Sequence, residues 1–393
     1  STRLAVHLGH LAQVPLVFWL VRQLGGDDRA ALLAATVRAA FFGVANNVVP
    51  LATTMDLEMT FSLATLCAYI QANRSARWRW WLVAGALLGC AILARWSAAS
   101  LLAGFALHQL LRRQPVTEYR MPLAAALLAM ACCTPYLLWQ WANDWITFTH
   151  TAALNVSNTQ TWAERAASVA GFFTGITGLL NVFTPLFLAG LGVIVWRARK
   201  QPPYAAAAAA SMPLLLFYLA ISPGYRIEPS WLATPLLIIT VIGIGAVGSW
   251  LKTRWLVPAA AVLLLLALGF GAARLALRPP YDTGRTLATL ALDNLAGAPR
   301  DTTLTGSEFY GWTALLGYYL PGQPTVYRSA YYISYEPFQY DLWTHWPDHH
   351  GKDMLTLVSW EEEPHHLLDG FAPYVDEVRI VDGAPIHYWR LGW

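Results

Sequence analysis

Ten apolar runs alternate along the chain with short connections, and every second connection is rich in Lys and Arg. The runs cover residues 4–21, 30–52, 57–73, 78–94, 97–111, 121–140, 170–196, 204–221, 230–249 and 255–277. The alternate connections hold thirteen basic residues, whereas the other connections and the N-terminal tip hold four: Arg3, Arg95, Arg165 and Arg226. Because cations beside membrane helices are retained on the cytoplasmic side, the pattern predicts a polytopic α-helical membrane protein with both termini outside.

The composition agrees with a membrane-embedded chain. Hydrophobic residues make up 56% and charged residues 12% of the sequence, whereas soluble domains contain about 25% charged residues. A hydrocarbon core of about 30 Å needs about 20 apolar residues in a helix, and most runs approach this length. The run at 170–196 is long and contains Gly171, Gly175, Gly178 and Asn181. We expect it to begin as an interfacial or broken helix and to span from about Phe183.

The character of the sequence changes near residue 278, after which the apolar runs shorten to the length of strands. Two helices are expected, Asp282–Leu295 and Phe309–Leu320. The expected strands are Thr302–Thr305, Pro324–Tyr327, Met354–Val358, Val378–Val381 and Ile386–Leu391. Strands that alternate with helices are typical of α/β layers. The sequence therefore predicts a transmembrane domain at 1–278 and a small outer α/β domain with a mixed sheet at 279–393.

The sequence lacks the motifs that are typical of several classes of function. It has no Gly-rich phosphate loop and no basic stripe for nucleic acid, and its four cysteines all fall inside apolar runs. The histidines His345, His349, His350, His365 and His366 match no zinc-ligand spacing and are interpreted as surface or structural residues. The chain begins at Ser1 without a signal-peptide pattern, and we expect it to be a fragment or a processed chain that lacks upstream sequence.

Ionisable groups at the outer helix ends are the first candidates for function, because charge at membrane depth is costly. Asp56 and Glu58 open a helix, Arg95 lies in a tight outer turn, and Arg226 precedes another helix. Each also has a plainer interpretation: a helix cap for the two acids, snorkelling for Arg95 and a local pair with Glu228 for Arg226. Arginine binds phosphate through a planar fork of donors, so one acid and two arginines on one face indicate a site for an anionic amphiphile.

Aromatic residues add a second group of candidates on the same predicted face. Trp139, Asn143 and Trp145 belong to a loop dense in aromatic and amide side chains, and Tyr225 lies beside Arg226. An interfacial aromatic belt is the plainer interpretation of this loop. We interpret these four residues, with Arg95 and Arg226, as candidate substrate-binding residues.

A family resemblance follows from five short motifs that occur in order on the predicted outer face. They are Thr54-Met55-Asp56, the turn from Ile92 to Ser97, the segment from Thr134 to Trp145, the loop from Ser222 to Trp231, and the element from Gln339 to Trp343. Together they resemble motifs of the GT-C glycosyltransferases related to aminoarabinose transferases and protein O-mannosyltransferases. Gln140 stands where that family usually has Asn, and Arg95 stands where Lys is usual.

The resemblance implies a glycosyltransferase that moves a sugar from a polyprenyl-phosphate donor to a lipid, glycan or protein acceptor. It implies that Asp56 and Glu58 are catalytic, that Arg226 and Arg95 neutralise the leaving phosphate, and that a divalent cation, Mg²⁺ or Mn²⁺, can serve as cofactor. The family's principal catalytic acid lies in a first outer loop, which is expected upstream of Ser1. The resemblance also implies a multi-pass protein of the bacterial inner membrane, with its C-terminal domain periplasmic or extracellular and membrane lipids as partners.

Two other functions remain open at this stage. A transporter could also line its path with polar residues at outer helix ends, although transporters usually show internal repeats and broken midplane helices. A noncatalytic, membrane-anchored binding protein is the third possibility. The sequence does not identify the sugar, the acceptor or the lipid chain of a donor.

Overall fold

The computed structural model describes residues 2–45, 54–113, 115–153, 161–180, 183–225, 227 and 229–250, isolated positions between 255 and 269, and five strands after residue 302. The chain divides into two compact units, Ser1–Trp139 with Asn155–Arg274, and Gln140–Leu154 with Leu275–Trp393. The predicted domain boundary at 278 and 279 falls among residues outside this description and stays a prediction.

The first nine apolar runs all contain helices. In chain order these are α1 (Thr2–Gln23), α2 (Asp28–Ala45), α3 (Thr54–Ser75), α4 (Trp78–Ala94), the 3-10 turn η1 (Trp96–Ala98), α5 (Ala99–Leu111), η2 (Val116–Tyr119), α6 (Arg120–Ala142), α7 (Ile146–Ala153), α8 (Trp162–Leu180), α9 (Thr184–Arg197), α10 (Pro202–Ile221), η4 (Pro229–Leu232) and α11 (Ala233–Trp250). The connection 141–169 between two of the predicted runs contains α7 and the start of α8. The tenth run, 255–277, lies almost wholly outside the described residues.

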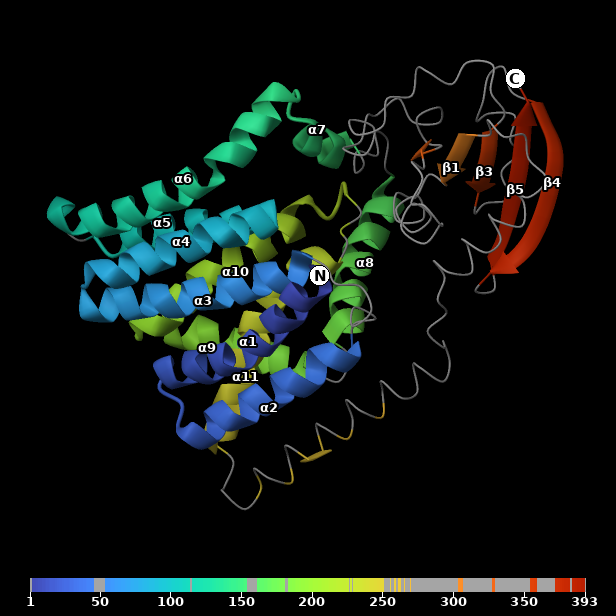
Figure 1. Cartoon of the computed structure of the whole chain (residues 1–393). Coiled ribbons are helices and arrows are strands. Elements are labelled where there is room, and N and C mark those ends of the chain that lie inside the picture. The colour runs from blue at the N-terminus through green and yellow to red at the C-terminus, as the bar shows by residue number, and fades with distance from the viewer. Residues whose placement is uncertain are drawn as a thin grey trace. The chain divides into compact units, whose positions relative to one another are not determined.

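The helices of the first unit pack around α3 and α11. Helix α1 packs against α2 and α3, α3 against α4, and α11 against α9 and α2; Figure 1 shows α1, α2 and α3 in blue, side by side. Of the three helical segments long and apolar enough to cross a membrane, the one at 229–250, which contains α11, is the most buried, with 89% of its most apolar 18 residues inside the protein. Gly243 of α11 faces Gly190 of α9, where an added Cβ would lie 1.8 Å from the oxygen of Leu186. Small residues let two membrane helices approach closely in this way.

By length and composition, three helices of the described part can cross a membrane: residues 117–142, 202–221 and 229–250. The pair α8 and α9 would make a fourth if the two form one span. These helices show a multi-pass membrane protein, but they do not confirm ten spans. Helices α1 and α3 are each 22 residues long. Their mean hydropathy is lowered by polar side chains such as Gln13, Gln23 and Glu58, which are buried inside the protein.

The long run at 170–196 is broken where the glycines and Asn181 suggested. Helix α8 ends at Leu180, α9 begins at Thr184, and the two are bent by 109°. The expected interruption before Phe183 is therefore confirmed. Pro185 stands in the first turn of α9, where proline is tolerated because the first amide groups of a helix need no partner within it.

Five strands in the C-terminal part form one mixed sheet. They are β1 (Thr303–Gly306), β2 (Tyr327–Arg328), β3 (Met354–Val358), β4 (Ala372–Val381) and β5 (Ala384–Gly392), in the spatial order β2-β1-β3-β5-β4. The pairs β1–β2 and β1–β3 are parallel, and the pairs β3–β5 and β4–β5 are antiparallel. The long β4 and β5 arrows stand together in red in Figure 1. The helices expected at 282–295 and 309–320 lie outside the described residues, so the α/β class stays a prediction.

Candidate functional site

Asp56 lies in the first turn of α3 and is almost fully buried, with 6% of its surface exposed. A carboxylate in this position interacts favourably with the positive end of the helix dipole, which is the capping role that the sequence left open. The structure adds side-chain partners that a cap alone does not need. The Oδ1 atom of Asp56 lies 3.6 Å from Nδ1 of His10 on α1, and Asp56 also interacts electrostatically with Arg38 of α2.

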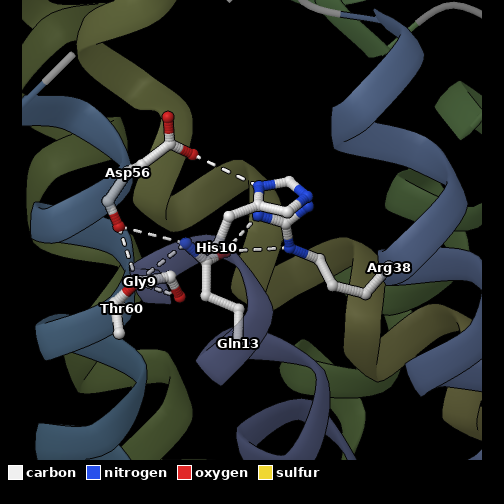
Figure 2. Close-up of polar contacts among 6 residues, drawn as sticks. All are labelled: Gly9, His10, Gln13, Arg38, Asp56 and Thr60. Atoms are coloured by element: carbon white, nitrogen blue, oxygen red, sulfur yellow. Dashed lines mark hydrogen bonds and ion pairs between the residues drawn. The ribbon is translucent and has the colours of Figure 1, made fainter. Parts of the chain in front are cut away.

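Gln13 lies on α1 and links α3, which carries Asp56, to Arg38 of α2. Its side-chain nitrogen donates to the main-chain oxygen of Asp56 at 3.0 Å and to the hydroxyl of Thr60 at 2.9 Å. Its side-chain oxygen accepts a hydrogen bond from Nε of Arg38 at 2.9 Å. Figure 2 shows the amide of Gln13 between the guanidinium of Arg38 and the first turn of α3. Three helices therefore meet at Asp56 through one connected polar network.

Glu58 forms a second charged site, in which residues from several elements contact its carboxylate. It is 1% exposed, and its Oε1 atom accepts hydrogen bonds from Ser97 of η1 at 3.4 Å and from Thr234 of α11 at 3.2 Å. Its Oε2 atom lies 4.0 Å from Nη1 of Arg95. Arg95 also donates to the main-chain oxygen of Ser230 at 3.4 Å. The turn after α4 is thus joined to α3 and to the region where α11 begins.

Arg95 is held loosely at this second site. Its described contacts, an ion pair at 4.0 Å and a hydrogen bond at 3.4 Å, are long by the usual criteria. The side chain keeps 23% of its surface exposed. The guanidinium is therefore in a position to exchange these weak partners for a stronger one, such as the oxygens of a phosphate.

Among the residues that the structure describes, the two acids share no partner. Two positions along a helix correspond to a rotation of about 200°, so Asp56 and Glu58 leave α3 on different faces. Asp56 turns to α1 and α2, whereas Glu58 turns to η1 and α11. The sequence placed Asp56 and Arg95 on one predicted outer face, but the ion pair that the structure describes for Arg95 is with Glu58. A shared site for Asp56, Arg95 and Arg226 stays a prediction.

The aromatic segment lies at the end of α6 and belongs largely to the second unit. Trp139 and Asn143 are half-buried and Trp145 is exposed, with its ring centre 6.4 Å from that of Trp141. Asp144 and Trp145 adopt positive φ angles of 51° and 56°, which non-glycine residues rarely do. Gln140 is buried at this turn, and its side-chain nitrogen donates to Thr147 of α7 at 2.6 Å. The amide that replaces the family's Asn therefore joins α6 to α7.

The remaining candidates lie in the loop before α11. Tyr225 is half-buried and packs against the apolar core, as does Trp231, whose ring centre is 5.6 Å from that of Tyr218. Arg226 and Glu228 lie outside the described residues, so the proposed roles of both stay predictions.

A divalent cation finds no suitable set of ligands in the described part of the chain. No group of three His, Cys, Asp or Glu side chains gathers there. Asp56 interacts electrostatically with Arg38, and the oxygens of Glu58 already interact with two hydroxyls and Arg95. Mg²⁺ prefers about six oxygen ligands, and these residues do not supply them. We therefore assign no step to a metal ion.

Sequence reasoning missed Arg38, Gln13 and His10. Each lies inside an apolar run, and a polar or charged residue inside such a run is itself a signal of function or of a buried partner. Arg38 interrupts the run 30–52 ten residues after the start of α2. The signal was therefore present in the sequence, but the partners depend on the rotation of three helices about their axes.

Part of the chain that contains these sites resembles a known protein family. A sequence model of the dolichyl-phosphate-mannose-protein mannosyltransferase family matches residues 1–139. The resemblance to that family is confirmed over these residues. They include Asp56, Glu58, Arg95 and the network around Arg38 and Gln13. No curated protein sequence matches the chain significantly.

The fold is also found in a solved structure. The crystal structure of ArnT from Cupriavidus metallidurans bound to undecaprenyl phosphate matches with a TM-score of 0.57 and 15% sequence identity. The match covers 98% of this chain and 83% of the ArnT chain. At this identity the comparison shows the fold, and it confirms the GT-C fold that the motifs suggested.

Proposed function

We propose that the protein is a glycosyltransferase that takes a sugar from a polyprenyl-phosphate donor in a bacterial inner membrane. The observation that carries the proposal is the match of residues 1–139 to the mannosyltransferase family, because this segment contains both buried carboxylates of α3. The GT-C fold shared with ArnT, whose crystals contained undecaprenyl phosphate, supports the donor class. The acceptor is a lipid, glycan or protein group exposed on the outer face.

The donor's phosphate is assigned to the arginines. A polyprenyl chain stays in the bilayer while its phosphate lies at the surface, where Arg95 is partly exposed and weakly held. Arg226 is assigned to the same phosphate because it lies in the loop next to Ser230, which Arg95 contacts. A fork of donors stabilises the negative charge that develops on the leaving group. Glu58 is the weak partner of Arg95 that the phosphate of the donor replaces.

Asp56 is assigned to the acceptor. During transfer the anomeric carbon forms a bond to the acceptor's nucleophilic atom and its bond to the phosphate oxygen breaks. The polyprenyl phosphate leaves with the electron pair, and a carboxylate accepts the acceptor's proton. In this interpretation Asp56 orients the acceptor. Trp139, Asn143, Trp145 and Tyr225 are assigned to the binding of sugar and lipid, and the outer domain at 279–393 to covering the site or holding acceptor.

The test is a transfer assay with the complete gene product in proteoliposomes. Radiolabelled polyprenyl-phosphate sugar is supplied with a membrane extract as the source of acceptors. The proposal predicts label in an acceptor and release of polyprenyl phosphate. Uptake of labelled solutes without any transfer would instead favour a transporter, and donor binding without transfer would favour a noncatalytic binding protein.

A companion measurement addresses the arginines directly. Arg226→Ala should weaken binding of polyprenyl phosphate strongly, and Arg226→Lys should weaken it less because a charge remains without the fork. Equal binding by both variants and the unmodified protein would remove Arg226 from the site.

A further inference from the structure

Arg38 is a buried charge in the middle of an apolar helix. It lies within α2 and exposes only 2% of its surface. Removing an ionised group from water is costly unless it is paired and hydrogen-bonded. A neutral apolar residue would pack at this position without that cost. The structure therefore points to a specific use for the charge.

The contacts of Arg38 lead directly to α3. Nε and Nη2 of its guanidinium both donate to the side-chain oxygen of Gln13. The amide nitrogen of Gln13 then donates to the main-chain oxygen of Asp56 and to the hydroxyl of Thr60. The hydroxyl of Thr60 lies 2.7 Å from the main-chain oxygen of Asp56 and 2.9 Å from the main-chain oxygen of Gly9 on α1. The first turn of α3 is thus hydrogen-bonded to α1 and, through Gln13, is linked to Arg38 of α2.

The same arrangement acts on the carboxylate of Asp56. Arg38 interacts with it electrostatically, and His10 approaches it to 3.6 Å from α1. Glu58, the next acid along α3, is directed to a different set of partners. The guanidinium that acts on the charge of Asp56 also donates to Gln13, and Gln13 in turn donates to the main-chain oxygen of Asp56. Position and charge of this one side chain depend on the same network.

We propose that Arg38 and Gln13 are positioning residues for Asp56. They fix the first turn of α3 and balance the charge of its carboxylate, so that Asp56 meets the acceptor in one orientation. Neither residue touches the reacting groups. This inference rests on the proposed function, because the proposed function assigns Asp56 a role in sugar transfer.

Gln23 supplies a matched control for Gln13. Both glutamines lie on α1, both are buried, and each donates its side-chain amide to a main-chain oxygen of α3 at 3.0 Å. Gln23 reaches Cys67, which lies three turns beyond Asp56 on α3. Gln13→Leu and Gln23→Leu therefore remove the same kind of bond between the same two helices. Gln13→Leu also removes the bond to Thr60 and the acceptor of Arg38, so it alone should loosen the first turn of α3 and affect the chemistry.

The experiment measures transfer kinetics and main-chain hydrogen exchange of the complete protein in proteoliposomes. Gln13→Leu is expected to lower kcat about tenfold or more with little change in KM, since misplacing a catalytic group acts on the transition state. Gln23→Leu is expected to leave kcat near that of the unmodified protein. Equal kcat in the two variants would overturn the inference.

Two substitutions of Arg38 separate charge from hydrogen bonding. Arg38→Lys keeps the charge, whereas Arg38→Gln keeps a neutral donor near the position of Nε. The inference predicts a higher kcat for Arg38→Lys than for Arg38→Gln. Equal kcat for both, at the level of the unmodified protein, contradicts it. If neither Arg38 variant folds, the comparison of Gln13 with Gln23 still decides.

Hydrogen exchange keeps this test independent of the reaction. Gln13→Leu should speed exchange of the amides at 57–60, and Gln23→Leu should not. If the unmodified protein transfers no sugar but these amides respond as predicted, the proposed function fails while the support of Asp56 stands. If transfer occurs and the amides do not respond to Gln13→Leu, the positioning inference fails and the function stands.

Discussion

The ion pair between Glu58 and Arg95 gives a quantitative prediction when it is compared with the pair between Arg22 and Asp28. The charged atoms of Glu58 and Arg95 lie farther apart, but their side chains are more deeply buried. The two side chains are 2% and 23% exposed, and their charged atoms lie 4.0 Å apart. Two unit charges at this separation attract by about 1 kcal/mol in water and by about 4 kcal/mol at an effective dielectric constant of 20. Part of that gain is offset by desolvation. We expect a coupling free energy of about 2 kcal/mol, within the usual range for contacting residues.

The assay is a double-mutant cycle with Glu58→Gln, Arg95→Gln and the double variant, unfolded with SDS in mixed micelles. The pair between Arg22 and Asp28 is the control, since its atoms are closer, at 3.0 Å, but its side chains are 45% and 72% exposed. Exposed pairs contribute about 0.2–1 kcal/mol. Burial should therefore outweigh distance, and the Glu58 cycle should give the larger coupling. A coupling at Glu58 equal to or below that at Asp28 would refute this reasoning.

Further predictions concern packing, the turn after α6 and the orientation in the membrane. Gly243→Ala should destabilise the protein by about 1–3 kcal/mol through overpacking against α9, whereas Gly192→Ala, which meets nothing within 4 Å, should be nearly neutral in the same SDS titration. Gln140→Leu removes the hydrogen bond to Thr147 and should increase proteolytic cleavage between α6 and α7; unchanged cleavage argues against this connection. A cysteine at position 300 should react with an impermeant reagent from outside and one at position 77 only after the inner face is opened; the reverse pattern would invert the topology.

Much of the helical unit follows from local sequence. The run at 78–94 has the same bounds as α4, and the interruption near Phe183 was foreseen from Gly178 and Asn181. These features depend on the period and length of apolar runs and on glycine, which act over a few residues. The turn at Arg95 was also predictable, since it separates two apolar segments by a very short connection.

The partners of the charged residues were not predictable in the same way. Gln13 reaches Asp56 across 43 positions, and Thr234 reaches Glu58 across 176. Such contacts depend on how each helix is rotated when it packs, which no local pattern specifies. Strand β4 shows the same limit: it extends to Ala372, beyond the expected 378–381, because it pairs along its length with β5.

The most direct test of the central claim is the turnover of Asp56→Asn with a radiolabelled polyprenyl-phosphate sugar in proteoliposomes, measured beside its affinity for polyprenyl phosphate. If Asp56 acts on the acceptor, kcat should fall by about 10²-fold or more, and donor affinity should change little because the arginines carry the phosphate. Turnover equal to that of the unmodified protein would contradict the account and leave Asp56 with the helix-capping role alone.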